Sequence, residues 1–263
     1  MSDLALVLTQ TRYALISTSR NPRAVVFSIA FPVILLVLFN EIFIKSSDTV
    51  KVAGETVSGS AYFTAGMIAY ATGLLCFTQP LVMLTAQRER GQLKRLRGTP
   101  VPAWTFIAAQ VLRSLLLAVV VGAVMLAMGI VFWNVDLPGS TLPGFLITLA
   151  LGTGTLCALG VATTAFTTTE DTASSIGPFT MVMLSFISGI FIPIDQLPGW
   201  LQEIGRIFPL YHLTQGLQLA VTGAGGSLGL NADDVASLVL WGIAGLAVAS
   251  RRFLWEPQGR SGG

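Results

Sequence analysis

Charge is scarce in this chain, and the residues that build most enzyme and cofactor sites are scarcer still. Asp, Glu, Lys and Arg make up 11% of the 263 residues, against about 25% in ordinary soluble domains. The single histidine, His212, excludes a histidine cluster for a metal ion. None of the three lysines follows a glycine, which excludes the usual phosphate-binding loop of an ATPase. We therefore expect this chain to perform no catalysis and to bind no metal or cofactor itself.

A further absence concerns transport chemistry. No carboxylate pair lies at membrane depth, although ion-driven carriers usually keep ionisable groups near the midplane.

The two cysteines, Cys76 and Cys157, each fall inside an apolar run. We expect them to be small apolar fillers rather than a disulfide or part of a metal site.

What the chain does contain is long apolar sequence. Hydrophobic residues make up 53% of the chain, and the mean hydropathy is +0.74. Apolar runs longer than about 18 residues predict an all-α polytopic membrane protein. We expect one transmembrane domain over residues 1–263. Six transmembrane helices are predicted at residues 25–44, 61–84, 103–132, 142–166, 173–194 and 235–250.

Two segments outside these spans also look membrane-associated. Residues 1–23 mix apolar and polar side chains, which predicts a helix lying in the membrane interface. Residues 195–231 hold two partly apolar pieces, Leu197–Ile207 and Phe208–Val221, that are each too short to cross. We expect these pieces to dip into the outer face or to lie on it.

The distribution of Lys and Arg predicts the orientation. With the N-terminus inside, eleven of the fifteen bases fall in inner segments and three in outer ones, while Arg113 lies within a span. Because cytoplasmic loops carry an excess of bases, both termini are predicted to be cytoplasmic.

The densest charge lies in QRERGQLKRLRGTPV, between the second and third spans. If this segment is helical, three of its bases share one face and two leucines share another. These residues are Arg90, Lys94 and Arg97, and Leu93 and Leu96. Like charges four residues apart and Gly91, which costs up to ~1 kcal/mol, leave the helix weakly supported. From these residues alone, the bases either set topology and touch lipid phosphates, or help the segment dock on an acidic partner.

Two motifs resemble the membrane subunits of ATP-binding-cassette type-2 transporters. The run RERGQLKRLRGTPVP resembles their cytoplasmic loop, and Ser188–Leu217, SGIFIPIDQLPGWLQEIGRIFPLYHLTQGL, resembles their outer segment after the fifth span. The span count, span order and loop lengths are similar over the whole chain. The resemblance is strongest to the bacterial, daunorubicin-exporter-like branch.

This resemblance implies a dimer of permeases, identical or paralogous, bound to separate ATPase subunits that hold ATP and Mg. The basic loop would be a coupling helix over residues 87–100, and the loop with Glu170 and Asp171 a second ATPase contact. The second and fifth spans would line the pathway at the dimer axis. The coupling residues implied are Glu89, Arg90, Gly91, Leu93, Lys94, Arg95, Leu96, Arg97, Thr99 and Pro100. A re-entrant outer hairpin would contain Pro193, Pro198, Tyr211 and His212.

Side chains within the spans have both functional and structural interpretations. Arg113 would bind a substrate anion or Glu41, but its position in a long third span favours snorkelling to the inner interface. Aromatic residues of the second and fifth spans would line an apolar route or simply pack, and serines would allow close helix contact. The pathway candidates are Tyr70, Phe77, Phe179, Ser185 and Ser188.

The sequence thus predicts the permease of an ATP-driven exporter in a bacterial cell membrane, with hydrophobic or amphipathic cargo such as a drug or a lipid. An ATP-independent channel or secondary carrier is the main alternative. A lipid-modifying enzyme is a further alternative, although the chain has no clustered catalytic residues.

Overall fold

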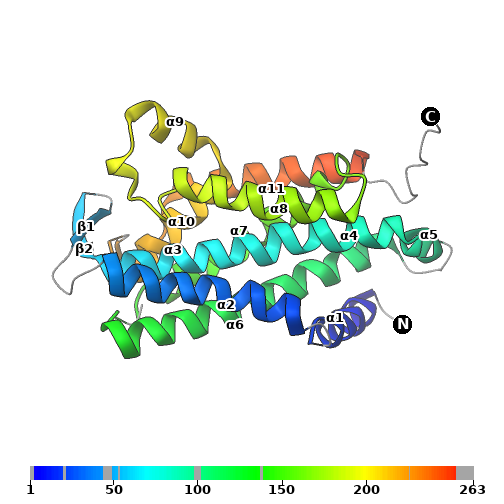
Figure 1. The fold of residues 1–263 in the computed structure, drawn as a ribbon, viewed down its shortest axis with the longest axis horizontal. Coiled ribbons are helices and arrows are strands. Elements are labelled where there is room, and N and C mark those ends of the chain that lie inside the picture. The colour runs from blue at the N-terminus through cyan, green and yellow to red at the C-terminus, as the bar shows by residue number, and fades with distance from the viewer. Residues whose placement is uncertain are drawn as a thin grey trace.

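The computed structural model describes residues 3–19, 22–43, 49–52, 54–97, 102–136, 139–224 and 226–252. Long helices lie side by side along the long axis of the molecule, with a β-hairpin at one end and a short helix, α5, at the other (Figure 1). Within these described residues, four helices are long and apolar enough to cross a membrane, as expected of a polytopic membrane protein. They are Gly59–Glu89, Trp104–Trp133, Leu142–Thr163 and Ala232–Arg251.

The elements follow one another in a simple order. The first part contains α1 (Asp3–Ser19), α2 (Pro22–Leu38), the π-helical η1 (Phe39–Phe43), β1 (Thr49–Val52) and β2 (Glu55–Ser58). The middle contains α3 (Gly59–Gly73), the π-helical η2 (Leu74–Thr78), α4 (Gln79–Glu89), α5 (Gln92–Arg97), α6 (Ala103–Trp133), α7 (Leu142–Thr163) and α8 (Glu170–Ile187). The last part contains η3 (Ile194–Gln196), α9 (Gly199–Ile207), α10 (Pro209–Thr222), η4 (Gly226–Leu228) and α11 (Ala232–Arg252).

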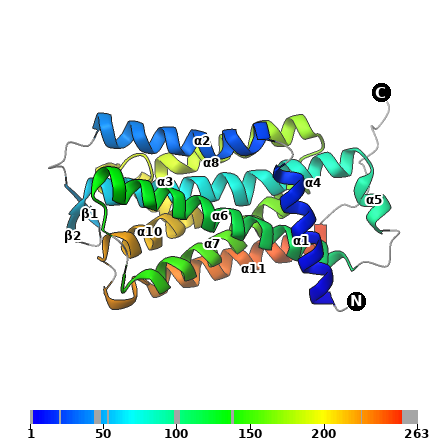
Figure 2. The ribbon, with the colours of Figure 1, turned by 90° about the horizontal axis from the view of Figure 1, so that it is seen from below.

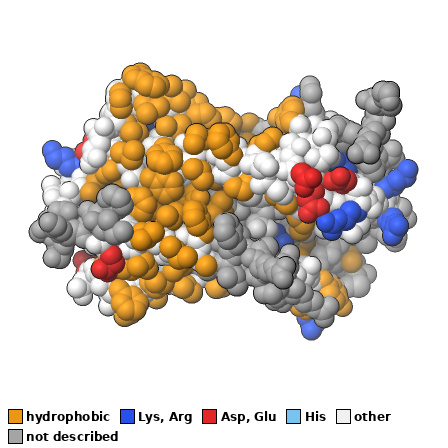
Figure 3. Space-filling view, viewed as in Figure 1, with side chains coloured by type: hydrophobic (Ala, Val, Ile, Leu, Met, Phe, Trp, Pro, Cys, Tyr) orange, Lys and Arg blue, Asp and Glu red, His pale blue; other side chains and the backbone are white. Residues whose placement is uncertain are grey.

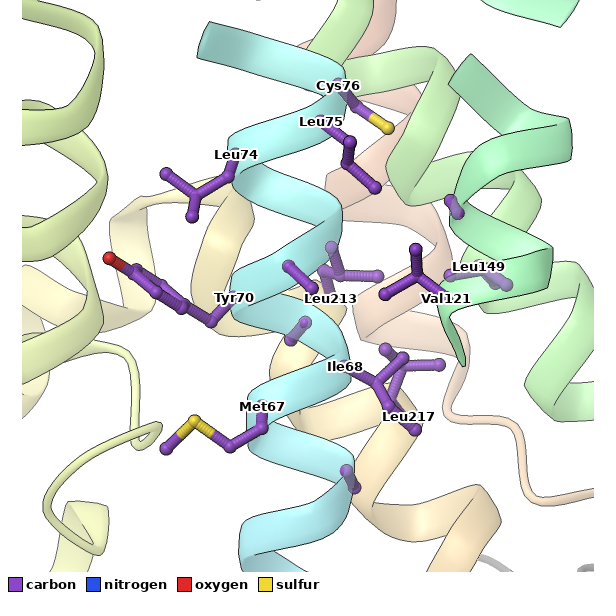
Figure 4. Close-up of a cluster of buried hydrophobic side chains, with 14 of the residues drawn as sticks. Met67, Ile68, Tyr70, Leu74, Leu75, Cys76, Val121, Leu149, Leu213 and Leu217 are labelled. Atoms are coloured by element: carbon purple, nitrogen blue, oxygen red, sulfur yellow. The ribbon is translucent and has the colours of Figure 1, made fainter. Parts of the chain in front are cut away.

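The continuous helix of α3, η2 and α4 is the centre of the bundle. Of its most apolar stretch, 83% is buried inside the protein, against 22% for α11. Figure 4 shows Ile68 pointing toward Val121 of α6 and Leu149 of α7, while Tyr70 points to the opposite side. Because lipid tails are as apolar as these side chains, close packing rather than the hydrophobic effect holds the helices together.

A π-helical segment interrupts this central helix just before a proline. Pro80 lacks the N–H that would bond a carbonyl four residues earlier, and its ring crowds the preceding turn. The wider turn of η2 accommodates the proline. At this point Gly160 of α7 comes so close that a Cβ would lie 2.5 Å from the carbonyl oxygen of Phe77. A small residue of α7 thus allows close contact between this helix and the central helix.

The flanking helices expose apolar side chains to the surroundings. Those of α6 include Leu116, Val120, Val124 and Val131, and those of α11 include Leu240, Ile243 and Leu246. In Figure 3, apolar side chains cover the broad middle of the visible face, and charged ones gather toward the α5 end. This distribution fits a bundle surrounded by lipid with one highly charged end.

Helix α1 crosses the long helices near the α5 end instead of running parallel to them (Figure 2). It packs against α6, where the Thr11 hydroxyl donates to the carbonyl of Val7 at 2.8 Å and lies 3.5 Å from the Ala109 carbonyl. Leu4, Leu8 and Tyr13 are exposed on α1. The interfacial role expected of residues 1–23 stays a prediction.

The opposite end holds a feature that the sequence interpretation missed. Residues within the polar segment 45–60 form an antiparallel hairpin in which Thr49 pairs with Ser58 and Val52 with Glu55. Val52 is buried with Phe63 of α3. The two short helices expected between residues 197 and 221 are present as α9 and α10, and α10 packs on α3, α7 and α11.

Several bounds differ from the predicted ones. The helix expected over residues 87–100 is divided, because α4 continues to Glu89 and α5 covers only Gln92–Arg97; residues 98–100 lie outside the described part. The fifth span was expected to reach residue 194, but α8 ends at Ile187, shortly before Gly189 adopts φ +76°. The described parts of α2 and α8 do not qualify as membrane-spanning by length and composition, so six spans remain a prediction.

Candidate functional site

The end of the bundle that carries α5, the last turn of α4 and the turn between α7 and α8 is called the basic end below. Helix α4 stops because Gly91 adopts φ +68°, a left-handed conformation typical of the residue after a helix end. The Gly91 amide donates to the carbonyl of Arg88 at 2.9 Å, which closes the last turn. Because α4 ends here, three consecutive charged side chains lie beside the α7–α8 turn: Arg88, Glu89 and Arg90.

Arg88 is buried in the protein, with 2% of its surface exposed. Its Nη1 donates to the carbonyl of Thr164 at 2.7 Å, and its Nη2 donates to the carbonyl of Thr167. Both acceptors lie just beyond α7, where carbonyls have no donor within the helix. The planar guanidinium fork thus satisfies two carbonyls and places a positive charge at a helix C-terminus.

Glu89 and Arg90 contact the start of α8. The carboxylate of Glu89 accepts the backbone N–H of Glu170 at 2.8 Å, and Arg90 Nη2 lies 2.7 Å from the Glu170 carboxylate. A carboxylate is stabilised at the positive end of a helix, which explains the place of Glu89 at the first residue of α8. Glu170 therefore meets the basic segment, whereas Asp171 is exposed beside it.

Helix α5 projects from this point with two faces. Lys94 and Arg95 are exposed, whereas Leu93 is buried with 2% of its surface accessible. Leu93 was expected to dock on a partner, but its side chain is already covered by this chain. Of the other predicted coupling residues, the side chains of Leu96 and Arg97, together with Thr99 and Pro100, lie outside what the structure describes.

The expected pathway residues do not share one open surface. Tyr70, Phe77, Ser185 and Ser188 are buried inside the protein, whereas Phe179 is 64% exposed on α8. The Ser185 hydroxyl donates to the carbonyl four residues earlier in its own helix. In this conformation the described residues therefore form a packed interface at these positions, with one exposed aromatic beside it.

Arg113 is buried between helices. It is 6% exposed, and its Nη1 lies 3.7 Å from the sulfur of Met83. Glu41 does not meet Arg113 either, since it accepts a hydrogen bond from the indole of Trp133 at 3.0 Å. Snorkelling of Arg113 to the inner interface therefore stays a prediction, while neighbouring residues cover its side chain.

The predicted outer hairpin residues lie in and around α9 and α10. Pro198 precedes α9 and is exposed, whereas Pro193 is buried before η3. His212 of α10 has Nδ1 2.7 Å from the Asp234 carboxylate and Nε2 2.9 Å from the Arg206 carbonyl. Each ring nitrogen therefore lies within hydrogen-bond distance of an oxygen of another segment.

Tyr211 is adjacent to this group. Its ring lies edge-on to that of His212, with the ring centroids 5.2 Å apart. The structure thus gives both predicted residues places in the packing of α10 against neighbouring elements.

The role of Arg88 is not visible in a count of bases, which treats every Lys and Arg of the segment alike. Leu81, Thr85 and Arg88 recur at helical spacing along α4, and all three are buried. A base on the apolar face of a helix is the signal that separates Arg88 from its exposed neighbours.

Comparison with known proteins agrees with the arrangement of the fold and the basic end. Residues 5–221 match the model of the family described as ABC-2 type transporter. The chain is also 26% identical over 154 residues to the protein named "Probable multidrug ABC transporter permease YbhR" in Escherichia coli K12, with the same values for O157:H7. These alignments cover 58% of this chain and 41% of the relatives, so the chain matches about two fifths of their length.

The family match covers α1 to most of α10, including the whole basic end. Permeases of ABC transporters generally work with ATPase subunits, and the resemblance to this family that the sequence motifs indicate is confirmed. This chain belongs to the ABC-2 type transporter family of membrane permeases.

Proposed function

We propose that this chain, with a second copy or a paralogue, forms the export pathway of a transporter driven by separate ATPase subunits that bind ATP and Mg. The observation that carries the proposal is the connected surface at the basic end. There α5 presents Lys94 and Arg95 to solvent, and the start of α8, which is bonded to the residues just before α5, exposes Asp171. A partner of complementary charge can contact both segments at once.

The orientation follows from the same charges. The basic end faces the cytoplasm and the hairpin end faces outward, because cytoplasmic segments carry the excess of Lys and Arg. We propose that α2 and α8 cross the bilayer with the four long helices, which gives six spans in the bacterial cell membrane with both termini inside.

The second permease is proposed to sit on α8. Four exposed apolar side chains recur along this helix at spacings of three or four residues: Ile176, Phe179, Met183 and Phe186. Helix α2 adds the exposed Ile34, Val37 and Leu38. A pathway between two such faces is apolar, which favours hydrophobic or amphipathic cargo such as a drug or a lipid. The relative's name, which describes a probable multidrug permease, agrees with this class of cargo.

In the proposed cycle, Tyr70, Phe77, Ser185 and Ser188 become accessible when α3 and η2 separate from α8. Their burial in this conformation then corresponds to a closed pathway. A ligand-driven opening requires that ATP-bound partners contact the open and closed forms differently.

The test uses the affinity-tagged chain purified from native membranes. We expect an ABC ATPase, identified by mass spectrometry, to co-purify and to hydrolyse ATP. The double variant Lys94→Glu with Arg95→Glu should lose both the ATPase and the hydrolysis. Lys51→Glu is the matched control, because Lys51 is an exposed base at the opposite end. Retention of the ATPase by the double variant contradicts the proposed docking surface.

ATP-independent uptake of ethidium by vesicles containing the purified chain alone would favour a channel or carrier.

A further inference from the structure

We infer that Arg88 is a positioning residue that joins the end of α4 to the α7–α8 turn, so that both proposed ATPase contacts move as one body. This inference rests on the proposed function, because it concerns how motion of the ATPase enters the membrane domain. It assigns to a buried side chain a role that its exposed neighbours on α5 do not have.

The first support is the burial of a charged group. Removing a guanidinium from water is costly unless its donors are satisfied. Arg88 is nevertheless buried, and its guanidinium donates to two carbonyls of one short turn, those of Thr164 and Thr167. Only a long, flat donor with two N–H groups in a fork reaches both carbonyls at once.

The second support is the number of bonds between the same two segments. Five hydrogen bonds join residues 85–90 to residues 164–170. Besides the two from Arg88, they include one between the hydroxyls of Thr85 and Thr167 at 3.1 Å. The remaining two are made by Glu89 and Arg90 to Glu170. Such a connected polar network resists separation more than an isolated pair does.

The network also lies at a branch point of the fold. Helix α4 continues into the central helix, α7 packs along α11 and α10, and α8 packs on α4 and η2. A displacement applied to α5 therefore reaches three long helices together. Without Arg88, the same displacement would be absorbed by relative movement at the α4–α7 contact.

The direct test measures the distance between α5 and α8 in the complex with the ATPase. Spin labels are placed at Gln92→Cys and Ser174→Cys, both exposed positions, in a Cys76→Ala and Cys157→Ala background. We expect one distance that stays the same between the nucleotide-free state and the state trapped with ATP and vanadate. A distance that changes with nucleotide overturns the inference.

The second test removes the bonds of Arg88. Arg88→Met should broaden the label distance and reduce ATP hydrolysis by the complex by about 5- to 150-fold, the usual range of a coupling between sites. Arg88→Lys should recover part of this loss, because a lysine can donate but cannot span both carbonyls. Arg206→Met, the same change at an exposed base of the hairpin end, is the control. If Arg88→Met keeps both the distance and the hydrolysis rate, the inference is wrong.

A variant that fails to insert is replaced by Glu170→Gln, which weakens the network from its exposed side. This variant should broaden the distribution of the same distance, and an unchanged distribution contradicts the inference.

The two proposals, ATPase docking and the role of Arg88, fail in different ways. If no ATPase assembles with the wild-type chain, both are wrong. If the complex assembles and hydrolyses ATP while the label distance shifts, only the role of Arg88 is wrong.

Discussion

The hydroxyl of Tyr62 donates to the carbonyl oxygen of Gly189 at 2.6 Å, although the two residues are 127 positions apart in the sequence. The side-chain amide of Gln218 donates to the same oxygen at 3.1 Å. Gly189 presents this oxygen through its φ of +76°, a conformation that side-chain-bearing residues rarely adopt. Helix α3, the segment after α8, and α10 therefore meet at a single atom.

Removing the Tyr62 hydroxyl should weaken this junction. We expect Tyr62→Phe to lower the free energy of unfolding by about 1 kcal/mol, the usual net value of a buried hydrogen bond. The thermal midpoint in detergent can be followed with a thiol-reactive dye, because Cys76 and Cys157 are both buried in the folded protein. Tyr13→Phe is the control, since Tyr13 is exposed on α1. Equal midpoints for the two variants would show that the junction contributes nothing to stability.

Two glycines of α7 should respond to alanine with opposite signs. Gly160→Ala places a Cβ 2.5 Å from the Phe77 carbonyl oxygen, so one helix must move, at a cost of about 1–3 kcal/mol. Gly154→Ala meets nothing within 4 Å. It should stabilise α7 by about 0.5–1 kcal/mol through helix propensity. Thermal midpoints of the two variants measure this difference, and a shared direction would contradict the close approach of α7 to η2.

The pair of His212 and Asp234 joins α10 to α11 with little exposure, at 12% and 6% of the two side chains. His212→Leu leaves the Asp234 carboxylate buried without this partner. We expect a loss of about 3–5 kcal/mol, as for other broken buried pairs. Adding Asp234→Asn should recover part of the loss, because the uncompensated charge is gone. Asp233→Asn, at an exposed acid of the same helical turn, should leave the midpoint unchanged.

A second permease on α8 should be detectable by crosslinking. Phe179→Cys places a thiol at a 64% exposed position of α8, and we expect a bifunctional thiol reagent to link two permeases in native membranes. Leu246→Cys, 56% exposed on α11, is the control and should give single chains on a denaturing gel. Crosslinking through α11 but not α8 would place the second permease on the other side of the bundle.

Local sequence predicted most of the long helices, because a lipid-surrounded helix must be apolar and long enough to cross. It did not show which helix is central. The central helix carries Thr64, Thr72, Thr78 and Thr85, and all four are buried. Polar residues within a predicted span are therefore a sign that other helices cover that span. Burial itself depends on contacts with helices far away in the sequence.

The candidate site was only partly predictable for a related reason. The charge pattern placed a basic segment on one side of the membrane, but it treated Arg88 and Arg90 alike. Their difference depends on the position of the α7–α8 turn, more than 70 residues later. The hairpin β1–β2 was also missed, because its strands are only four residues long and the burial of Val52 depends on Phe63 and Leu219, which are distant in sequence.

Two hydroxyl groups in the middle of the bundle, one on α3 and one on α10, donate within their own helices. Thr72 donates to the carbonyl of Ile68 at 2.8 Å, and Thr214 to that of Leu210 at 2.7 Å. Each hydrogen is thereby already used, so these hydroxyls do not act as donors to a neighbouring helix. Contact between α3 and α10 at these levels then relies on dispersion, which has no preferred direction. The contact between α3 and α10 can therefore shift in small steps. The directional hydrogen bonds of Arg88 and Tyr62 instead fix the relative positions of the segments that they join at the two ends of the bundle.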